Sequence, residues 1–281
     1  MTSPSDTRPA GRPVRLVILA RPDPIQIWTT NRVAALVPVT AVLSETGRTF
    51  TDRHRRRFRT LIRKNGLAGA LDRYLDLAYF KWRTRRDGHD ATIDRVLGPG
   101  ASRGGWAPGL EVHEVDSVNA PESVALLRRL APDLVFCNGA SILKPPVIAI
   151  PPLGTINIHT GVVPEYRGPA PEFWALHDGA FDMVGVTVHM LTEGIDDGDV
   201  LLERRTEVRP GDNEISLRCK NVQAGAELVA EAVRQVAEGA AHPRPQDPAR
   251  AATRPRRSRR AHRVMLRRLR EIPPAGTGQA S

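Results

Sequence analysis

Short runs of apolar residues recur along the chain, and amphipathic segments separate most of them. Such runs, rich in Val, Ile and Leu, are typical of buried strands. The predicted strands cover residues 14–20, 39–44, 110–115, 133–138, 154–160, 184–191 and 201–208. Helices are predicted over 24–36, over 121–130, shortly after Ser141, and from Asn213 to Gly239. This alternation indicates an α/β fold built on a doubly wound, mostly parallel sheet of the Rossmann-like type.

A basic insertion at about residues 46–105 interrupts this alternation. Its apolar residues are spaced as on one face of a helix, and Arg and Lys crowd both ends. These apolar residues are Leu71, Tyr74, Leu75, Ala78 and Trp82. We expect this face to pack against the rest of the protein, with attachment to a membrane surface as the alternative.

The formal net charge of +10 is distributed unevenly over the 281 residues. Residues 51–90 carry +7 and residues 250–270 carry +10, so the rest of the chain carries −7. We interpret the two basic segments as solvated helices; contact with RNA, an anionic lipid surface or a phosphorylated substrate is the alternative. Residues 1–13 are expected to form a disordered N-terminus, and residues 241–281 a Pro- and Arg-rich basic C-terminal tail.

The composition narrows the class of protein further. Hydrophobic residues make up 41% of the chain, which is enough for a real core and excludes collagen-like and fully disordered chains. No apolar stretch approaches the roughly 18 to 20 residues that a membrane span needs. The chain has two cysteines and no metal-ligand spacing, so we expect a cytoplasmic protein without a bound metal.

Candidate chemistry is concentrated at the end of one predicted strand and in one later turn. Asn157 and His159 are two residues apart on a strand, so their side chains share a face. An acidic, glycine-flanked turn at 193–199 supplies carboxylates, among them Asp196. An amide, an imidazole and a carboxylate suit acyl transfer, in which a developing oxyanion needs donors and the attacking group must lose a proton. No nucleophile-elbow pattern occurs, which favours direct transfer to an acceptor through a tetrahedral intermediate.

Two longer stretches around these residues carry a family resemblance. INIHTGVVPEYRGPAPEFWALHDG, at 156–179, and GVTVHMLTEGIDDGDVLLE, at 185–203, resemble the formyltransferases that use N10-formyltetrahydrofolate. That family includes glycinamide ribonucleotide, methionyl-tRNA and amino-sugar N-formyltransferases. The resemblance covers residues 133–238 well and 14–45 loosely, and it implies a formyltransferase catalytic domain over residues 14–240.

The resemblance also implies roles for individual residues. Asn157 and a protonated His159 would stabilise the oxyanion, and Asp196 would hold the histidine charged and relay a proton through water. The segments that would hold the folate are Ser141, Ile142 and Leu143 together with Gly194 and Ile195. The loop that would lie beside the acceptor contains Tyr166, Arg167 and Gly168. The turn at 138–141 departs from the aromatic-containing turn of relatives, which affects the shape of the folate pocket.

The expected acceptor is the primary amine of a small molecule, either a nucleotide-linked amino sugar or a specialised-metabolite intermediate. The tRNA-acting relatives carry a C-terminal β-barrel domain, and the segment after the long helix lacks the strands for one. Methionyl-tRNA remains an alternative acceptor because of the basic segments, and a formyltetrahydrofolate hydrolase would use the same residues with water. A basic nucleic-acid-binding module without activity is a further alternative. His177 and His189 are interpreted as a helix-surface and a strand-packing residue. The sequence leaves the oligomeric state open.

Overall fold

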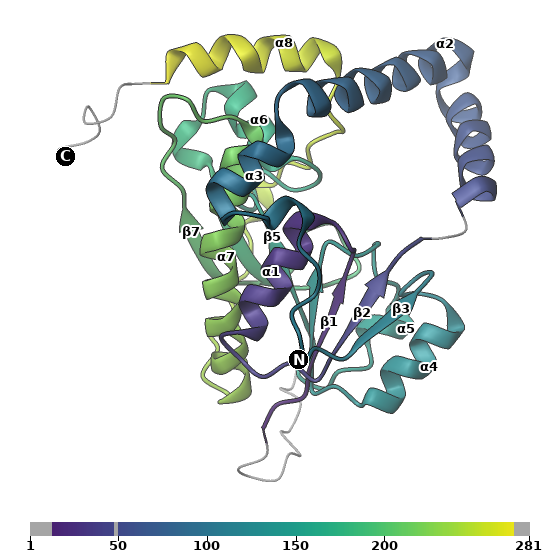
Figure 1. Cartoon of the computed structure of the whole chain (residues 1–281), viewed down its shortest axis with the longest axis vertical. Helices are drawn as coiled ribbons and strands as arrows, with labels where there is room; N and C mark the ends of the chain where they lie inside the picture. The colour runs from purple at the N-terminus through teal and green to yellow at the C-terminus, as the bar shows by residue number, and fades with distance from the viewer. Residues whose placement is uncertain (1–12, 48–49, 273–281) are drawn as a thin grey trace, which may run out of the picture.

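A seven-stranded sheet forms the centre of the molecule (Figure 1). The computed structural model describes residues 13–47 and 50–272, and of the side chains within 50–65 nothing is stated. The strands are β1 (Leu16–Ala20), β2 (Ala41–Glu45), β3 (Val112–Val115), β4 (Leu134–Asn138), β5 (Thr155–His159), β6 (Gly185–Met190) and β7 (Val200–Arg205). They are ordered β3-β2-β1-β4-β5-β6-β7. The first five pair in parallel, and β6 and β7 are antiparallel. The predicted doubly wound, mostly parallel sheet is thereby confirmed.

Helices cover both faces of the sheet. They are α1 (Pro24–Ala34), α2 (Phe50–Arg86), α3 (His89–Leu97), α4 (Pro121–Leu130), α5 (Pro145–Ile148), α6 (Pro171–Asp178), α7 (Glu214–Ala237) and α8 (Arg259–Arg268). Alternate residues of β1 point to opposite sides, as the pleat requires. Leu16 and Ile18 pack with residues of α1 and α7, whereas Val17 and Leu19 pack with residues of α4 and α5. One apolar layer therefore lies on each face of the sheet.

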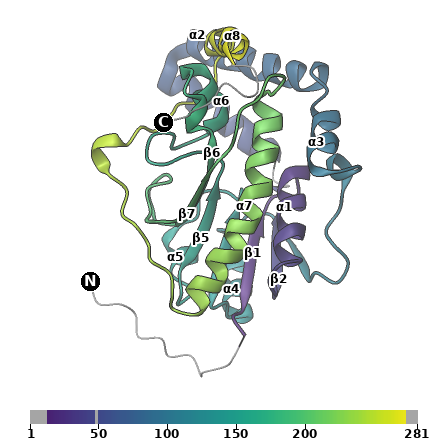
Figure 2. The same ribbon diagram turned by 90° about the vertical axis from the view of Figure 1, so that its left-hand side faces the viewer.

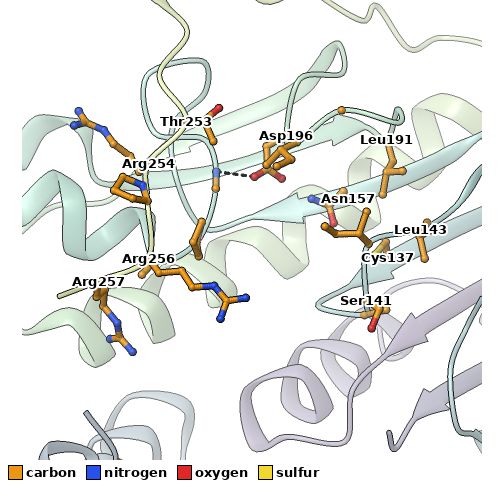
Figure 3. A pocket seen from close by; sticks show the side chains of 18 of the residues that line it. Cys137, Ser141, Leu143, Asn157, Leu191, Asp196, Thr253, Arg254, Arg256 and Arg257 are labelled. Carbon is orange, nitrogen blue, oxygen red and sulfur yellow. Dashed lines mark hydrogen bonds between the residues drawn. The ribbon is translucent and has the colours of Figure 1, made fainter. Parts of the chain in front are cut away.

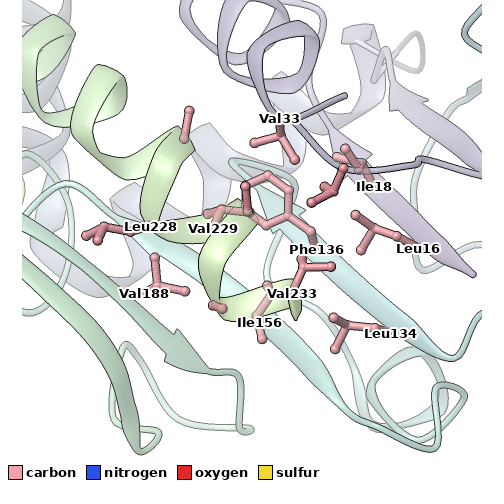
Figure 4. Packing of buried hydrophobic residues seen from close by; sticks show 14 of the residues in the cluster. Leu16, Ile18, Val33, Leu134, Phe136, Ile156, Val188, Leu228, Val229 and Val233 are labelled. Carbon is pink, nitrogen blue, oxygen red and sulfur yellow. The ribbon is translucent and has the colours of Figure 1, made fainter. Parts of the chain in front are cut away.

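The larger layer lies between the sheet and α7 (Figure 4). Phe136 of β4 and Val229 of α7 are completely buried in it. Gly225 lets α7 approach the sheet closely, because a Cβ at this position would lie 2.4 Å from Cδ1 of Ile158. The helix begins at a capping box, in which the Asn213 side chain accepts hydrogen bonds from the backbone of residues 215 and 216. Because α7 covers one face of β5, only the opposite face of this strand is left to line a pocket.

The basic segments come together at one end of the molecule, where α2 lies beside α8 (Figures 1 and 2). The α2 helix is kinked at Gly66, whose φ is 70°. Asp76 of α2 is buried and accepts hydrogen bonds from the backbone and side chain of Arg259. Tyr79 bonds His262 of α8 at 2.8 Å. No helix in the described ranges has the length and apolar character needed to cross a bilayer.

The predicted packing of the apolar face of this helix is wrong. Leu71, Tyr74, Leu75 and Trp82 are 58%, 63%, 42% and 49% exposed. The face of α2 that contacts the protein is the polar one around Asp76, because α8 supplies charged partners for it. Periodicity identified the apolar face correctly, but it gave no information about whether another element covers that face.

The C-terminal segment runs along the sheet and past the carboxyl end of β5. Residue 244 forms an antiparallel bridge with Val200, and Thr253 forms a parallel bridge with Arg167. The backbone N–H of Ala252 donates to the carbonyl of Pro164 at 2.9 Å. We call residues 244–257 the tail segment. The predicted disordered N-terminus, residues 1–13, falls almost entirely outside the described residues, and the predicted domain boundaries remain predictions.

Candidate active site

A pocket of about 770 Å³ opens on the sheet face opposite α7 (Figure 3). Three neighbouring strands contribute one residue each at the same level of the sheet. Cys137 of β4 is paired with Asn157 of β5, and Asn157 is paired with His189 of β6. Because paired residues of adjacent strands point to the same face, all three side chains line the pocket. The pocket lies beside the carboxyl end of β4, next to β1, where the winding of the sheet reverses.

Asn157 and His189 form the first polar pair of the pocket. Nδ1 of His189 lies 2.8 Å from the carbonyl oxygen of Met190, and its Nε2 lies 3.1 Å from Nδ2 of Asn157. A carbonyl oxygen can only accept, so Nδ1 carries a proton. Within the described residues the Asn157 side-chain amide makes no other hydrogen bond, so it has an N–H available for a bound molecule. Sequence reasoning assigned His189 to strand packing, whereas the structure places it on the pocket wall.

His159 lies next to this pair but is buried, with 7% of its surface exposed. Its Nε2 is 2.7 Å from the carbonyl oxygen of Tyr166, and its Nδ1 is 3.5 Å from Oδ2 of Asp196. Both ring nitrogens therefore face oxygen acceptors, and the ring is held between the Tyr166 carbonyl and the Asp196 carboxylate.

Asp196 stands between the two histidines. Its Oδ2 accepts a hydrogen bond from the backbone N–H of Gly168 at 2.9 Å, and its Oδ1 lies 3.7 Å from Nε2 of His189. Burial alone would raise the pKa of Asp196, but His159, His189 and the Gly168 N–H together hold it well below its ordinary value. The carboxylate is therefore ionised throughout the physiological pH range. The predicted set of Asn157, His159 and Asp196 is brought together by the fold.

The tail segment holds the turn that carries Asp196. The side-chain amide of Gln246 donates to the carbonyl oxygens of Asp196 and Gly198, at 2.9 and 2.7 Å. The guanidinium of Arg167 donates in turn to Oε1 of Gln246, at 2.9 and 2.7 Å. Arg167 was predicted to lie beside the acceptor. In the structure its guanidinium is bonded to Gln246, and Gln246 in turn is bonded to the backbone of Asp196.

The other two predicted acceptor-loop residues occupy different positions. Gly168 lines the pocket, and its φ of 90° is in the left-handed region. A Cβ there would lie 2.8 Å from the carbonyl oxygen of Arg254, so the tail segment can pass this close only to glycine. Tyr166 is buried beneath the guanidinium of Arg254, 4.9 Å from the ring centre. Its role in the structure is to support the tail segment.

The residues predicted to hold the folate lie on two rims of the pocket. Ser141, Ile142 and Leu143 follow β4, whereas Gly194 and Ile195 belong to the Asp196 turn, and all five line the pocket. The backbone N–H of Ser141 donates to Oε2 of Glu45 at 2.7 Å, which fixes the first rim on β2. Ile142 and Ile195 are 77% and 50% exposed. Two apolar side chains are thus presented to solvent at the mouth of the pocket.

The opposite wall of the pocket is rich in arginine. The contributing residues come from α2, α7 and the tail segment: Arg73, Arg218, Arg254, Arg256 and Arg257. Arg256 extends from the tail segment toward the side of the pocket that holds Asn157 and Ser141, and Arg254 points away (Figure 3). Within the described residues, no carboxylate forms an ion pair with Arg256. Burial and the nearby charge of Arg256 lower the pKa of Arg73, so these two cations repel each other.

Comparisons with known proteins find formyltransferases, the family that the sequence resembles. Residues 109–233 match the formyl transferase family. The chain is 39% identical over 146 residues to the methionyl-tRNA formyltransferase of Anaeromyxobacter dehalogenans, which is 52% of this chain and 46% of that protein. It is 34% identical over 153 residues to the corresponding protein of Chlorobium chlorochromatii, covering 54% and 48%. The chain thus spans about half the length of the curated relatives it matches.

Solved structures share the fold at low sequence identity. Glycinamide ribonucleotide transformylase 1 from Symbiobacterium toebii superposes with a TM-score of 0.53 at 21% identity, covering 88% of this chain and all of that chain. A sugar N-formyltransferase from a Shewanella species gives a TM-score of 0.54 at 14% identity, covering 95% and 91%. Residues 109–233 are therefore similar to the formyl transferase family, and the α/β fold around them is shared with these solved structures.

Proposed function

We propose that the protein is an N-formyltransferase that moves the formyl group of N10-formyltetrahydrofolate to the primary amine of a small molecule. The observation that carries this proposal is the convergence of Asn157, His159 and Asp196 beside one open pocket. The folate would supply an activated formyl carbon. The acceptor amine would form the new C–N bond, the bond to the folate nitrogen would break, and one proton would pass from the amine to that nitrogen.

The chain's own groups are suited to the charges that such a transfer develops. The free N–H of Asn157 points to the pocket and can donate to an oxygen that becomes negative. Asp196, kept ionised by its neighbours, can orient a water that relays the proton from the attacking amine to the leaving folate nitrogen. His159 is buried, so we assign it the role of holding Asp196 charged and in place, and the oxyanion contact falls to Asn157.

The folate side of the pocket fits a flat, partly apolar ring. Ile142 and Ile195 stand exposed on two rims, and a ring bound between them would remove both from water. The backbone of residues 141–143 and 194–195 supplies polar groups at the ring's edge. The turn at residues 138–141 is held to Glu45 and leaves the pocket mouth open on that side.

The arginine wall favours an anionic acceptor. Arg256 has no carboxylate partner within the described residues, and it repels Arg73. A phosphate or diphosphate placed between them would remove this repulsion and accept charge-assisted hydrogen bonds from both. This supports a nucleotide-linked amino sugar, or a phosphorylated specialised-metabolite intermediate, as acceptor. We place the enzyme in the cytoplasm as part of the same proposal.

The test is a mass-resolved assay with N10-formyltetrahydrofolate and a panel of nucleotide-linked amino sugars, free amines and initiator methionyl-tRNA. We expect one small amine to gain ~28 Da, the mass of a carbonyl group replacing N–H by N–CHO, with the signal abolished by Asp196→Asn. Formyltetrahydrofolate consumed without any acceptor would instead indicate a hydrolase. No consumption with any acceptor would contradict the proposal.

Arg256→Gln separates the acceptor from the donor. We expect the KM for the acceptor to rise about tenfold while the KM for the folate is unchanged, because one charge-assisted contact is lost. A rise in the folate KM alone would show that the arginine wall binds the glutamate end of the folate. Arg260→Gln, an exposed arginine of α8 outside the pocket wall, is the matched control.

Methionyl-tRNA is the second candidate acceptor. The relatives at 34 to 39% identity are named methionyl-tRNA formyltransferases, and the chain has basic segments near the pocket. Formylated tRNA in the same assay, with a rate that falls steeply as salt is raised, would replace the small-molecule proposal.

A further inference from the structure

The exposed apolar face of α2 is unpartnered in the described structure. Leu67, Leu71, Tyr74, Leu75 and Trp82 lie on one side of the helix after its kink, and all are more than two-fifths exposed. We call these five residues the α2 stripe. From its first to its last residue the α2 stripe is about 22 Å long at 1.5 Å per residue. Contiguous exposed apolar surface of this kind marks an interaction site.

The opposite face of α2 is already occupied. Asp76 is bonded to Arg259, Tyr79 to His262, and Arg257 lies over the ring of Phe80. Asp76 and Phe80 lie about half a helical turn from the α2 stripe, whereas Tyr79 lies at its border, with its ring centre 6.1 Å from that of Trp82. The helix is therefore fixed to the protein by one face and presents the other outward, at the end of the molecule away from α4 (Figures 1 and 2).

Cations surround the α2 stripe. Lys81, Arg85 and Arg86 are exposed on the same helix, and the guanidinium of Arg86 lies 5.0 Å from the ring centre of Trp82. At the same end of the molecule α8, which packs on the other face of α2, carries the exposed arginines Arg260, Arg263 and Arg267. The acidic residues of this part of α2 are engaged on other sides: Asp72 and Asp76 with Arg259, and Asp87 with Arg83.

We propose that the α2 stripe docks the protein on the surface of an anionic lipid bilayer. A helix with Leu, Tyr and Trp on one face and Lys and Arg along its borders has the properties of an interfacial helix. The apolar side chains would enter the region between headgroups and acyl chains, and the arginines would contact lipid phosphates. A second copy of this chain would bring the same cations together and be repelled, and an RNA partner would not require the apolar residues.

The experiment uses the full chain and vesicles of phosphatidylcholine with or without phosphatidylglycerol. We expect sedimentation with the anionic vesicles only, weakening as salt is raised, because the basic residues attract the surface. The double variant Leu71→Ser, Trp82→Ser should reduce the bound fraction at least tenfold, since two apolar side chains no longer enter the lipid. Lys81→Gln, Arg85→Gln should reduce it about tenfold on anionic vesicles.

The controls use exposed residues at the other end of the molecule. Arg128→Gln, Arg129→Gln removes the same charge from α4 and should leave binding unchanged. The stripe variants should keep the wild-type melting temperature and formyltransferase rate, because none of the changed residues lines the pocket. Since lipid binding is read without substrate, its failure would not affect the proposed activity.

Three results would overturn the inference. One is equal sedimentation of wild type and stripe variant, and another is equal binding to neutral vesicles. The third is a stripe-dependent dimer in vesicle-free solution, which would assign the α2 stripe to a second copy. A shift of tryptophan emission on binding, present in wild type and absent in Trp82→Phe, would identify Trp82 as the residue that enters the lipid.

Discussion

The pocket and the α2–α8 end of the molecule both bring cations, carboxylates and apolar side chains together, but they hold them differently. In the pocket, Asp196 is fixed by a backbone N–H, two histidines and a turn held by Gln246. At the α2–α8 end, Asp72 and Asp76 pair with Arg259, whereas apolar side chains and several cations face solvent. The comparison indicates where the protein needs a fixed geometry and where it needs a free surface.

Asp196→Asn should have the largest effect on turnover. The neutral amide can neither take part in the proton relay nor attract the His159 ring as a carboxylate does, so we expect kcat to fall about 10²- to 10⁴-fold. Folate affinity, measured by calorimetry, should change little. His159→Ala should cause a comparable loss. Asp199→Asn changes an exposed carboxylate three residues away and should stay near the wild-type rate; near-normal rates in the first two variants would refute the assigned roles.

Gly168→Ala should damage the pocket through the tail segment. A Cβ would meet the Arg254 carbonyl and weaken the N–H bond to Asp196, so we expect both a lower melting temperature and a kcat reduced about 10- to 100-fold. Gly211 also has a φ of 87° but no atom near its Cβ position. Gly211→Ala therefore has the backbone strain alone and should lower stability without the loss of turnover. Equal turnover losses in both variants would show that strain, not the tail contact, is responsible.

Gln246→Ala should loosen the Asp196 turn. The substitution removes the hydrogen bonds to the carbonyls of Asp196 and Gly198 and the bond from Arg167. We expect it to lower the free energy of unfolding by about 1 to 2 kcal/mol. We expect a roughly tenfold lower kcat, with the acceptor KM little changed. A change in KM alone would indicate that Gln246 contacts the substrate instead.

Lowering the pH should destabilise the packing of α8 against α2, because His262 lies between these helices. Burial and the charges of Arg83 and Arg257 lower the pKa of His262 from 6.5 to about 4. Between these values the unfolded chain binds a proton that the folded chain does not, so stability is full above about pH 6.5 and decreases as the pH falls toward 4. Denaturant titrations at pH near 7.5 and near 5.5 should differ by about 1 kcal/mol. His89, whose pKa burial also lowers, contributes in the same direction. His262→Phe should reduce the difference, and an unchanged difference would assign it to other groups.

Leu71→Ser should have the smallest effect on folding. Leu71 is 58% exposed, so the substitution should change the free energy of unfolding of the protein by less than about 0.5 kcal/mol. Leu127→Ala in the core, where the side chain is 1% exposed, should cost about 2 to 5 kcal/mol. A large loss of stability in Leu71→Ser would mean that the α2 stripe packs within the folded protein.

The elements of the sheet could be predicted because each strand carries its own apolar pattern. Asn157 and His159 could be paired because they share a strand face, whereas the family resemblance singled out Asp196 among the carboxylates of the glycine-flanked turn. His189 was missed because its place opposite Asn157 depends on the antiparallel register of β6, which the local sequence does not specify. The arginine wall was missed for a related reason: Arg73, Arg218 and Arg256 come from three distant segments. The apolar face formed by Leu71, Tyr74, Leu75, Ala78 and Trp82 was expected to pack, because periodicity does not show whether a partner surface exists.

The tail segment also affects the order in which the protein becomes active during synthesis. The sheet strands and α7 lie within residues 16–237, whereas Gln246 and Arg256 follow them in the chain. A nascent chain can therefore form its sheet while the Asp196 turn is still unsupported and the arginine wall incomplete. The pocket is completed only when residues 244–257 have left the ribosome, so catalytic competence would come after the fold itself.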